Sequence, residues 1–392
     1  MNRSWFYVTA SWRAILFGGV GLLFAISLLM FRIGSLTNGA SPAEIAVSQR
    51  IWSYKEIFNN PINMPYNLIL TIGQKLHHHN LVNNRRLSAL MALAVVVAFY
   101  WLLRFWYSLR IATLGTLLFV SSSWLLRTGR YGTTDILQSL VIVPILISVW
   151  LMRTRRRFLV LILFSICAAL MLYIPGLIWL LILALALRAS TIILEVKKLP
   201  KWLIATCGLI FTVFLIPLIY GIVREPSIIL AVFGLPNHFS ILTFVNNFWH
   251  VPITIFIRSD LAAHLSIPHL PLLDIFSTAM AVLGIYACVN NLSLDRNRLV
   301  ICALIIGWVL ASLDGPVGLA LILPIIYLTI TAGLAFMLDD WFRVFPRNPL
   351  AGNIGATLMT VAVLLTVFYQ VNNYFIAWPN THTTRSEFSQ RF

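Results

Sequence analysis

The chain has 392 residues, of which 60% are hydrophobic and 10% charged, and its mean hydropathy is +0.89. Soluble domains carry about a quarter charged residues, so this composition excludes a water-soluble globular protein. Lys and Arg number 28 against 12 Asp and Glu, and in so apolar a chain the excess indicates membrane topology and attraction to anionic lipid, not a nucleic-acid partner.

A transmembrane helix takes roughly 20 apolar residues, and the apolar runs supply about eleven such spans. We therefore predict an all-α fold, a polytopic integral membrane bundle, with residues 1–392 forming a single membrane domain. The expected spans are 14–31, 88–103, 111–126, 136–152, 158–173, 175–194, 203–223, 271–290, 299–313, 316–337 and 354–371.

Basic residues gather in the short connections that follow every second span, most densely at 153–157. By the positive-inside rule these connections are cytoplasmic, which places the N-terminus inside the cell and the C-terminal tail outside. The protein is then a multi-pass protein of the cell (inner) membrane, with two long outer loops at 32–87 and 224–270. We expect the functional site on that extracytoplasmic face.

The first outer loop carries a carboxylate close to the first span. In the segment 41–44, serine at the N-cap, proline at the first helical position and Glu44 at the third form a capping box by spacing. Glu44 is therefore either a helix cap or an acid poised just outside the bilayer for proton transfer. Further along, apolar residues at 68, 69, 72 and 76 recur at helical spacing, which predicts a helix lying in the membrane interface.

The connection between the third and fourth spans, 127–135, holds Arg127, Arg130, Tyr131 and Asp135. Arginine suits phosphate because its planar guanidinium presents a fork of donors, and the carboxylate would stand beside the bound anion. In the alternative interpretation Asp135 caps the fourth span and both arginines anchor to lipid headgroups. In the second outer loop, Arg258 is the first choice for a further substrate contact.

Two other kinds of site are disfavoured. His77, His78 and His79 are successive residues, which in a helix point about 100° apart and rarely converge on one ion, so we interpret them as a solvated patch and no metal is indicated. The predicted spans are almost free of ionisable groups, whereas ion-coupled transporters usually carry them near the midplane. A non-enzymatic flippase or export component for lipid-linked glycans, or a structural membrane protein, is kept as the alternative function.

Three motifs together resemble the C-type glycosyltransferase (GT-C) superfamily, in the branch of bacterial protein O-mannosyltransferases and aminoarabinose transferases. They are the segment 42–44 early in the first outer loop, the Pro-rich, Tyr-containing segment 60–66, and 127–135 before the fourth span. The sequence departs from the family pattern at Ala43, where an Asp is usual, at Tyr173, where many members have Lys, and at 314–316, where relatives often show an Arg-Tyr pair.

The resemblance implies transfer of a sugar from a polyprenyl-phosphate-linked donor to an acceptor hydroxyl on a glycan, lipid or protein, at the outer surface of the bilayer. It implies Glu44 as the base and Asp135 as a second carboxylate that orients or assists the acceptor. Arg127, Arg130 and Arg258 would contact the donor phosphate, and Tyr66 and Tyr131 would contact substrate. The donor sugar, the acceptor and any cofactor are not encoded in these motifs.

Overall fold

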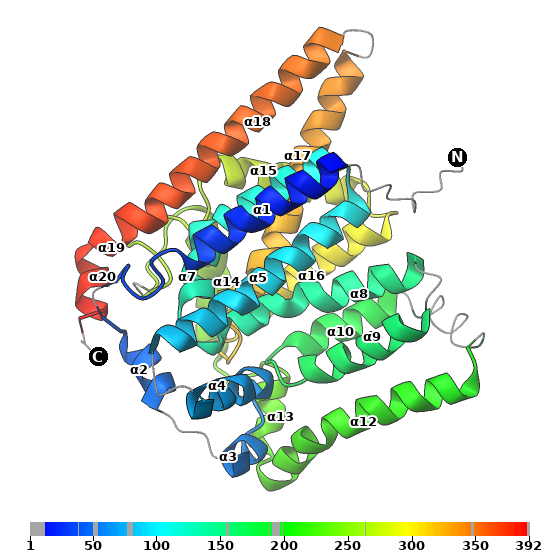
Figure 1. Cartoon of the computed structure of the whole chain (residues 1–392), viewed down its shortest axis with the longest axis vertical. Coiled ribbons are helices and arrows are strands. Elements are labelled where there is room, and N and C mark those ends of the chain that lie inside the picture. The colour runs from blue at the N-terminus through cyan, green and yellow to red at the C-terminus, as the bar shows by residue number, and fades with distance from the viewer. Residues whose placement is uncertain are drawn as a thin grey trace.

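A computed structural model describes residues 12–37, 39–49, 54–76, 81–153, 157–187, 189, 197, 199–262, 264–345 and 349–389. Within these ranges the chain is helical and contains no β-strand, as predicted (Figure 1). The first half comprises α1 (Trp12–Met30), α2 (Pro42–Gln49), α3 (Tyr54–Asn59), α4 (Met64–Leu76), α5 (Leu81–Trp106), α6 (Leu109–Ser121), α7 (Ser123–Arg130), the 3-10 helix η1 (Thr134–Val141), α8 (Ile142–Arg153), α9 (Arg157–Met171) and α10 (Leu177–Leu187).

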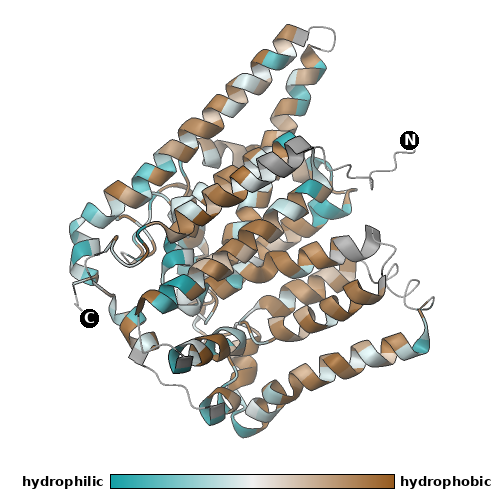
Figure 2. Ribbon diagram, in the orientation of Figure 1, coloured by the Kyte–Doolittle hydropathy of each residue, from teal (hydrophilic) through white to brown (hydrophobic). Residues whose placement is uncertain are grey.

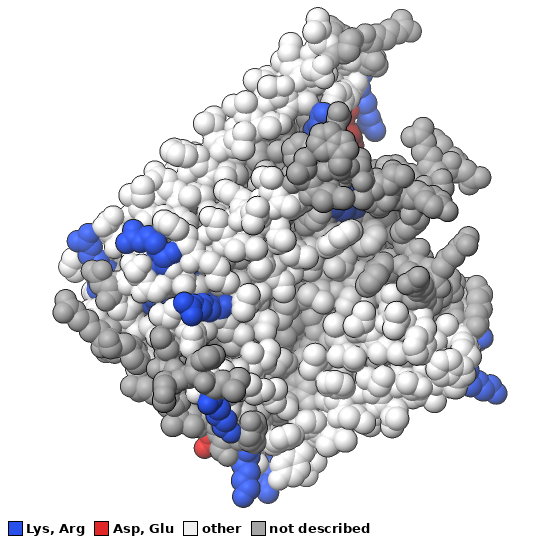
Figure 3. Space-filling view, in the orientation of Figure 1, with Lys and Arg blue, Asp and Glu red and all other residues white. Residues whose placement is uncertain are grey.

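The second half comprises α12 (Lys201–Arg224), α13 (Ser227–Val232), α14 (Ile241–Phe256), α15 (Ile275–Asn290), α16 (Asp295–Ser312), the 3-10 turn η2 (Leu319–Leu321), α17 (Ile322–Val344), α18 (Pro349–Asn372), a π-helical turn (Asn373–Ala377), α19 (Trp378–Asn380) and α20 (His382–Glu387). Apolar side chains follow the lengths of the long helices, and polar ones gather toward their ends (Figure 2). In the space-filling view, Lys and Arg lie at the two ends of the bundle with an uncharged body between them (Figure 3).

Each predicted span coincides with one or more helices, but the count of about eleven transmembrane helices is not confirmed. Among the described residues, four helices are long and apolar enough to cross a bilayer, and a fifth span results if α6 and α7, which meet at a 57° bend, are taken together. Six further apolar helices are shorter, at 10–17 residues, than the roughly 20 residues of a full crossing.

Helix α17 runs through the centre of the bundle and is almost wholly buried from Ile322 to Ala335. It crosses α15 at two glycines. A Cβ atom at Gly284 would lie 1.8 Å from the carbonyl oxygen of Thr329, and one at Gly333 would lie 2.0 Å from that of Met280. Only glycine permits the two backbones to approach this closely.

The first outer loop consists of short helices, and α4 is the predicted interfacial helix. Its Asn67 and Thr71 are buried against the protein, while Ile69 and Ile72 are exposed, as expected of a helix whose outer side meets lipid. The three histidines at 77–79 lie outside the described residues.

The second predicted outer loop, 224–270, is helical for nearly half of its length, because it contains α13 and α14. Helix α14 lies against α16, where the indole of Trp308 donates a hydrogen bond to the carbonyl of Phe248 at 2.8 Å. The sequence interpretation missed α14 because its apolar run is interrupted by polar residues such as Asn246 and His250.

The end of α1, helices α2 to α4, the start of α5 and the tail helices α19 and α20 gather at one end of the bundle, at the lower left of Figure 1. The start of α1 and the start of α12 lie at the other end. The first long loop and the C-terminal tail therefore share one side, as the predicted topology requires. Which side faces the cytoplasm stays a prediction.

Candidate anion site at one end of the bundle

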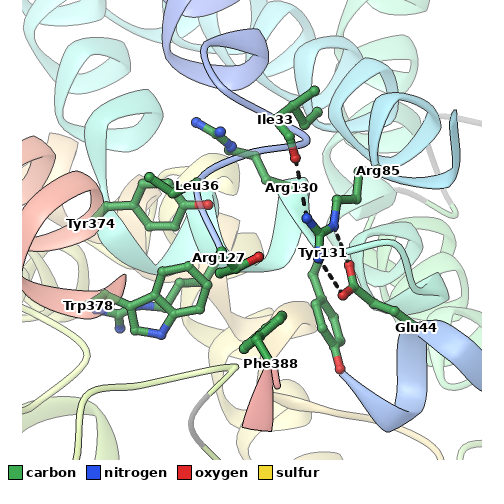
Figure 4. Close-up of a pocket in the computed structure, with 11 residues that line it drawn as sticks. Ile33, Leu36, Glu44, Arg85, Arg127, Arg130, Tyr131, Tyr374, Trp378 and Phe388 are labelled. Carbon is green, nitrogen blue, oxygen red and sulfur yellow. Dashed lines mark hydrogen bonds and ion pairs between the residues drawn. The ribbon is translucent and has the colours of Figure 1, made fainter. Parts of the chain in front are cut away.

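A pocket lies where the end of α1, α2, α5, α7 and the C-terminal tail meet (Figure 4). Four of its side chains are charged, namely Glu44, Arg85, Arg127 and Arg130, and each of these residues is at most 4% exposed. The complete lining is Ile33, Leu36, Thr37, Glu44, Arg85, Arg127, Arg130, Tyr131, Tyr374, Trp378 and Phe388. Three positive charges face one negative charge, so the lining favours an anion.

Glu44 is held in a buried ion pair with Arg85, a residue of α5. The Arg85 Nε and one terminal nitrogen donate to the two carboxylate oxygens, each at 2.7 Å. The backbone N–H groups of Ser41 and Gly132 also donate to the carboxylate, at 3.3 and 3.1 Å. The predicted capping box is confirmed, since the Glu44 N–H donates to the Ser41 hydroxyl at 3.2 Å. Four donors thus hold the Glu44 carboxylate in place.

Arg130 closes the C-terminal end of α1. Its terminal nitrogens donate to the carbonyl oxygens of Leu28 and Phe31 at 2.7 and 2.5 Å, where a helix presents unpaired acceptors and negative dipole charge. The guanidinium also lies over the rings of Tyr374 and Phe375, at 5.1 and 4.9 Å from their centroids. Arg130 therefore fixes the helix end as well as lining the pocket.

Arg127 connects α7 to two segments that are distant in sequence. One terminal nitrogen donates to the Leu265 carbonyl at 3.2 Å, and the other donates to the Asn373 side-chain oxygen at 2.7 Å. The Nε atoms of Arg127 and Arg130 are buried without a hydrogen-bond partner among the described residues. A buried donor without an acceptor is unfavourable, and a bound anion would supply acceptors. Since both residues are buried, the interpretation of these arginines as lipid-headgroup anchors is wrong.

Asp135 lies at the start of η1, close to the pocket but outside its lining. Its carboxylate accepts a hydrogen bond from the Thr133 hydroxyl at 3.1 Å. Burial raises the pKa of Asp135 above its ordinary value, and the Thr133 hydrogen bond and the His264 charge oppose that rise in pKa. Thr133 directly follows Gly132, which donates to Glu44, so neighbouring backbone positions bring the two acids to the same end of the bundle. The pairing of the two acids in one reaction stays a prediction.

Tyr131 contacts the start of α2, the connection after α14 and the C-terminal tail. Its hydroxyl lies 2.7 Å from the Ser41 hydroxyl, and its ring stacks on that of His264 at 4.7 Å. Burial raises the pKa of Tyr131, and the charges of Glu44, Glu387 and Asp135 raise this pKa further. The phenol therefore stays protonated and can donate a hydrogen bond at any physiological pH.

Two residues predicted to contact substrate lie elsewhere. Tyr66 is fully buried behind the pocket, where its hydroxyl lies 3.0 Å from that of Ser88. Arg258 is exposed and pairs with Asp260 at 3.2 Å, outside the lining. The expectations for these two are therefore not met by the geometry, because one is enclosed and the other points away.

Sequence reasoning missed Arg85 and the tail residues Tyr374, Trp378 and Phe388. Arg85 lies in the pair Arg85-Arg86, just before the apolar run of the second span. The pair indicates positive charge at the membrane interface, but it does not indicate that Arg85 binds Glu44, 41 residues away. The tail residues follow the last predicted span in a segment without apolar periodicity, so nothing in the sequence indicated that they line a pocket.

The fold and the pocket together define a helical membrane bundle with a buried, arginine-lined pocket at one end, and the predicted resemblance is confirmed for the fold alone. Two solved structures share this fold. ArnT from Cupriavidus metallidurans in the apo state has a TM-score of 0.52 and 14% identity, and the match covers 96% of this chain and 77% of that one. The same protein bound to undecaprenyl phosphate has a TM-score of 0.54 and 15% identity, with 97% and 77% covered. No protein-family model and no curated protein matches the sequence.

Proposed function

We propose that the chain is a membrane glycosyltransferase that moves a sugar from a polyprenyl-phosphate-linked donor to an acceptor hydroxyl at the extracytoplasmic face. The observation that carries the proposal is the buried three-arginine pocket, in which two guanidinium Nε donors have no described partner, beside two carboxylates. The fold shared with an ArnT structure bound to undecaprenyl phosphate supports a lipid phosphate as the anion.

The chemistry of such a transfer matches these groups. The acceptor oxygen forms a bond to the anomeric carbon as the bond from that carbon to the phosphate oxygen breaks. The proton of the acceptor hydroxyl passes to a carboxylate, and the lipid phosphate leaves as an anion. Arg127 and Arg130 would stabilise the charge that develops on the leaving phosphate.

The surroundings of the two acids favour a division of labour that differs from the one implied by the family motif. Glu44 accepts four hydrogen bonds, two of them from Arg85, so its carboxylate oxygens are engaged in holding that arginine. Asp135 accepts a side-chain hydrogen bond from Thr133, and its raised pKa favours proton uptake. In our proposal Asp135 is the base, and Glu44 positions Arg85.

Binding of undecaprenyl phosphate to the purified full chain tests the phosphate site. We expect Arg127→Gln to weaken binding about tenfold or more, because a hydrogen bond to a charged group contributes about 1.5–3 kcal/mol. Arg258→Gln is the matched control, since it removes an arginine outside the pocket. Equal binding by the two variants would exclude the pocket as the phosphate site.

Transfer itself is tested with an undecaprenyl-phosphate-linked sugar. We expect Asp135→Asn to abolish transfer and to leave undecaprenyl phosphate binding within about twofold of the wild type, since this acid lies outside the lining. Binding without any transfer, for every donor sugar supplied, would favour the flippase alternative.

A further inference from the structure

One wall of the arginine pocket is made by the end of the chain. After α18 the helix widens into the π-helical turn Asn373–Ala377, and α19 and α20 then fold back over the pocket. Trp378 and Phe388 line the pocket from this segment and are 4% and 3% exposed. Figure 4 shows their rings facing the arginines from the side opposite Glu44.

Among the described residues of the tail, one ionic contact fastens this wall to the rest of the bundle. Glu387 of α20 lies with its carboxylate oxygen 2.6 Å from Nδ1 of His264, in the connection after α14. Around this contact the rings of Phe388, Trp378 and Tyr131 pack edge to face, with centroids 5.6 Å apart for Phe388 and Trp378 and 6.3 Å for Phe388 and Tyr131. The side chains of His264 and Glu387 are 19% and 22% exposed, so water reaches the contact.

The pocket is closed to a ligand in this arrangement. Its volume is about 20 Å³, which is room for roughly one water molecule. A phosphate group carries four oxygen atoms, so neither it nor a sugar fits while Trp378 and Phe388 stay in place. One wall therefore has to move before an anion reaches the arginines.

The C-terminal wall is the one built to move. The other lining residues belong to, or directly follow, α1, α2, α5, α7 and α18. Trp378 and Phe388 pack into the same hydrophobic core, but they come from a segment of short helices. Helix α20 has six residues and is capped within itself, because the Thr384 N–H donates to the Thr381 hydroxyl at 3.3 Å. Its outer face, including Thr383 and Arg385, is exposed. A short, self-capped segment behind a π-helical turn can swing as a unit.

We propose that residues 378–389 form a removable cover over the arginine pocket, latched by Glu387 on His264, which swings away to admit a phosphate-bearing ligand. The identity of that ligand rests on the proposed function, whereas the movement of the cover does not. Opening exposes Arg127 and Arg130 to the anion, and closure over the bound headgroup brings the aromatic rings back against it and excludes water.

The movement is tested without any ligand by thiol labelling of a pocket residue. Thr37→Cys places a thiol in the lining, and an anionic methanethiosulfonate reagent reports its accessibility in the purified full chain, with the wild-type chain as background for the native cysteines. We expect Glu387→Gln in this background to speed labelling about tenfold, because it removes a charge-assisted hydrogen bond.

Glu225→Gln is the matched control, since Glu225 is exposed and accepts a hydrogen bond from Ser227 outside the pocket. Leu36→Cys provides a second lining position if Thr37→Cys does not fold. Equal labelling rates in the Glu387→Gln and Glu225→Gln variants would overturn the latch.

A reversible cross-link tests whether opening is required for binding. With cysteines at positions 264 and 387 joined by a short bis-methanethiosulfonate linker, we expect binding of undecaprenyl phosphate to fall at least about tenfold and to recover on reduction. Each single-cysteine variant treated with the linker should bind as before. Unchanged binding after cross-linking would overturn the cover, whereas absent binding before cross-linking would overturn the proposed function and leave the labelling result to decide the cover.

Discussion

Glu44 and Asp135 are carboxylates at the same end of the bundle, but their surroundings differ. The Glu44 carboxylate accepts two hydrogen bonds from Arg85 and two from the backbone N–H groups of Ser41 and Gly132. Burial favours the neutral form of Asp135 and raises its pKa. A pair of acids separated in this way can divide structural and proton-transfer roles.

The Glu44–Arg85 pair predicts a large stability effect. We expect Glu44→Gln to lower the free energy of unfolding by about 3–5 kcal/mol, because it leaves the Arg85 guanidinium buried without its counter-charge. Denaturant unfolding in detergent measures the change. The double variant Glu44→Gln/Arg85→Gln should lose less than the sum of the two single variants. A loss below about 1 kcal/mol in the Glu44→Gln variant would contradict a tightly held pair.

The raised pKa of Asp135 predicts a pH dependence of stability with a definite sign. The folded protein binds the Asp135 proton more tightly than the unfolded chain, so this residue destabilises the fold progressively as pH rises from the ordinary aspartate range through its raised pKa. Asp135→Asn removes the titration, so its stability relative to the wild type should increase over that window and then level off. Thermal unfolding of both proteins between acid and neutral pH measures the difference, and a flat difference would contradict the assignment.

At the scale of elements, the crossing of α15 and α17 depends on two glycines. We expect Gly284→Ala to destabilise the protein by about 1–3 kcal/mol or more. The methyl group of the alanine would overlap the backbone of Thr329, and a backbone cannot relieve the overlap by changing rotamer. Gly208→Ala in α12 is the control, because its Cβ would meet no atom within 4 Å and alanine favours a helix. Thermal unfolding compares the two, and equal melting temperatures would contradict the close crossing.

The helices were predictable from sequence wherever an apolar run was continuous, as in α5, α12 and α18, because burial in lipid demands such a run. Helix α14 was not predictable in this way, since it lies against α16 and mixes polar with apolar residues. Glu44 was found through its local capping pattern, which spans three residues. Its partner Arg85 was missed because a contact over 41 residues leaves no local signature.

The candidate site was predicted in part for the same reason. Segment 127–135 stood out by composition, and the structure places Arg127, Arg130 and Tyr131 in the pocket lining. The aromatic residues of the tail could not be assigned to the site from sequence, because their position depends on the chain folding back after α18. Tyr66 and Arg258 were assigned to the site by their residue types, but the fold determines which way each side chain points.

At the scale of the whole molecule, α12 provides a test of orientation because its two ends lie at opposite ends of the bundle (Figure 1). Lys201 and Arg224, at its first and last positions, are both exposed. In intact spheroplasts we expect a membrane-impermeant thiol reagent to label Arg224→Cys directly and Lys201→Cys only after permeabilisation. The reverse pattern would place the arginine pocket on the cytoplasmic side and contradict the predicted topology.

The hydrogen bonds from Arg130 to the last carbonyl groups of α1 connect the pocket to this helix. Helix α1 has an outward, apolar side on which Val20 and Leu23 are 64% and 67% exposed, as expected of a helix in contact with lipid. Such a helix adjusts its tilt when the thickness of the surrounding hydrocarbon changes. A change of tilt moves the carbonyls of Leu28 and Phe31, and the guanidinium follows them. Reconstitution into lipids of increasing acyl length should therefore change the affinity for the anion even though no lipid touches Arg130 itself.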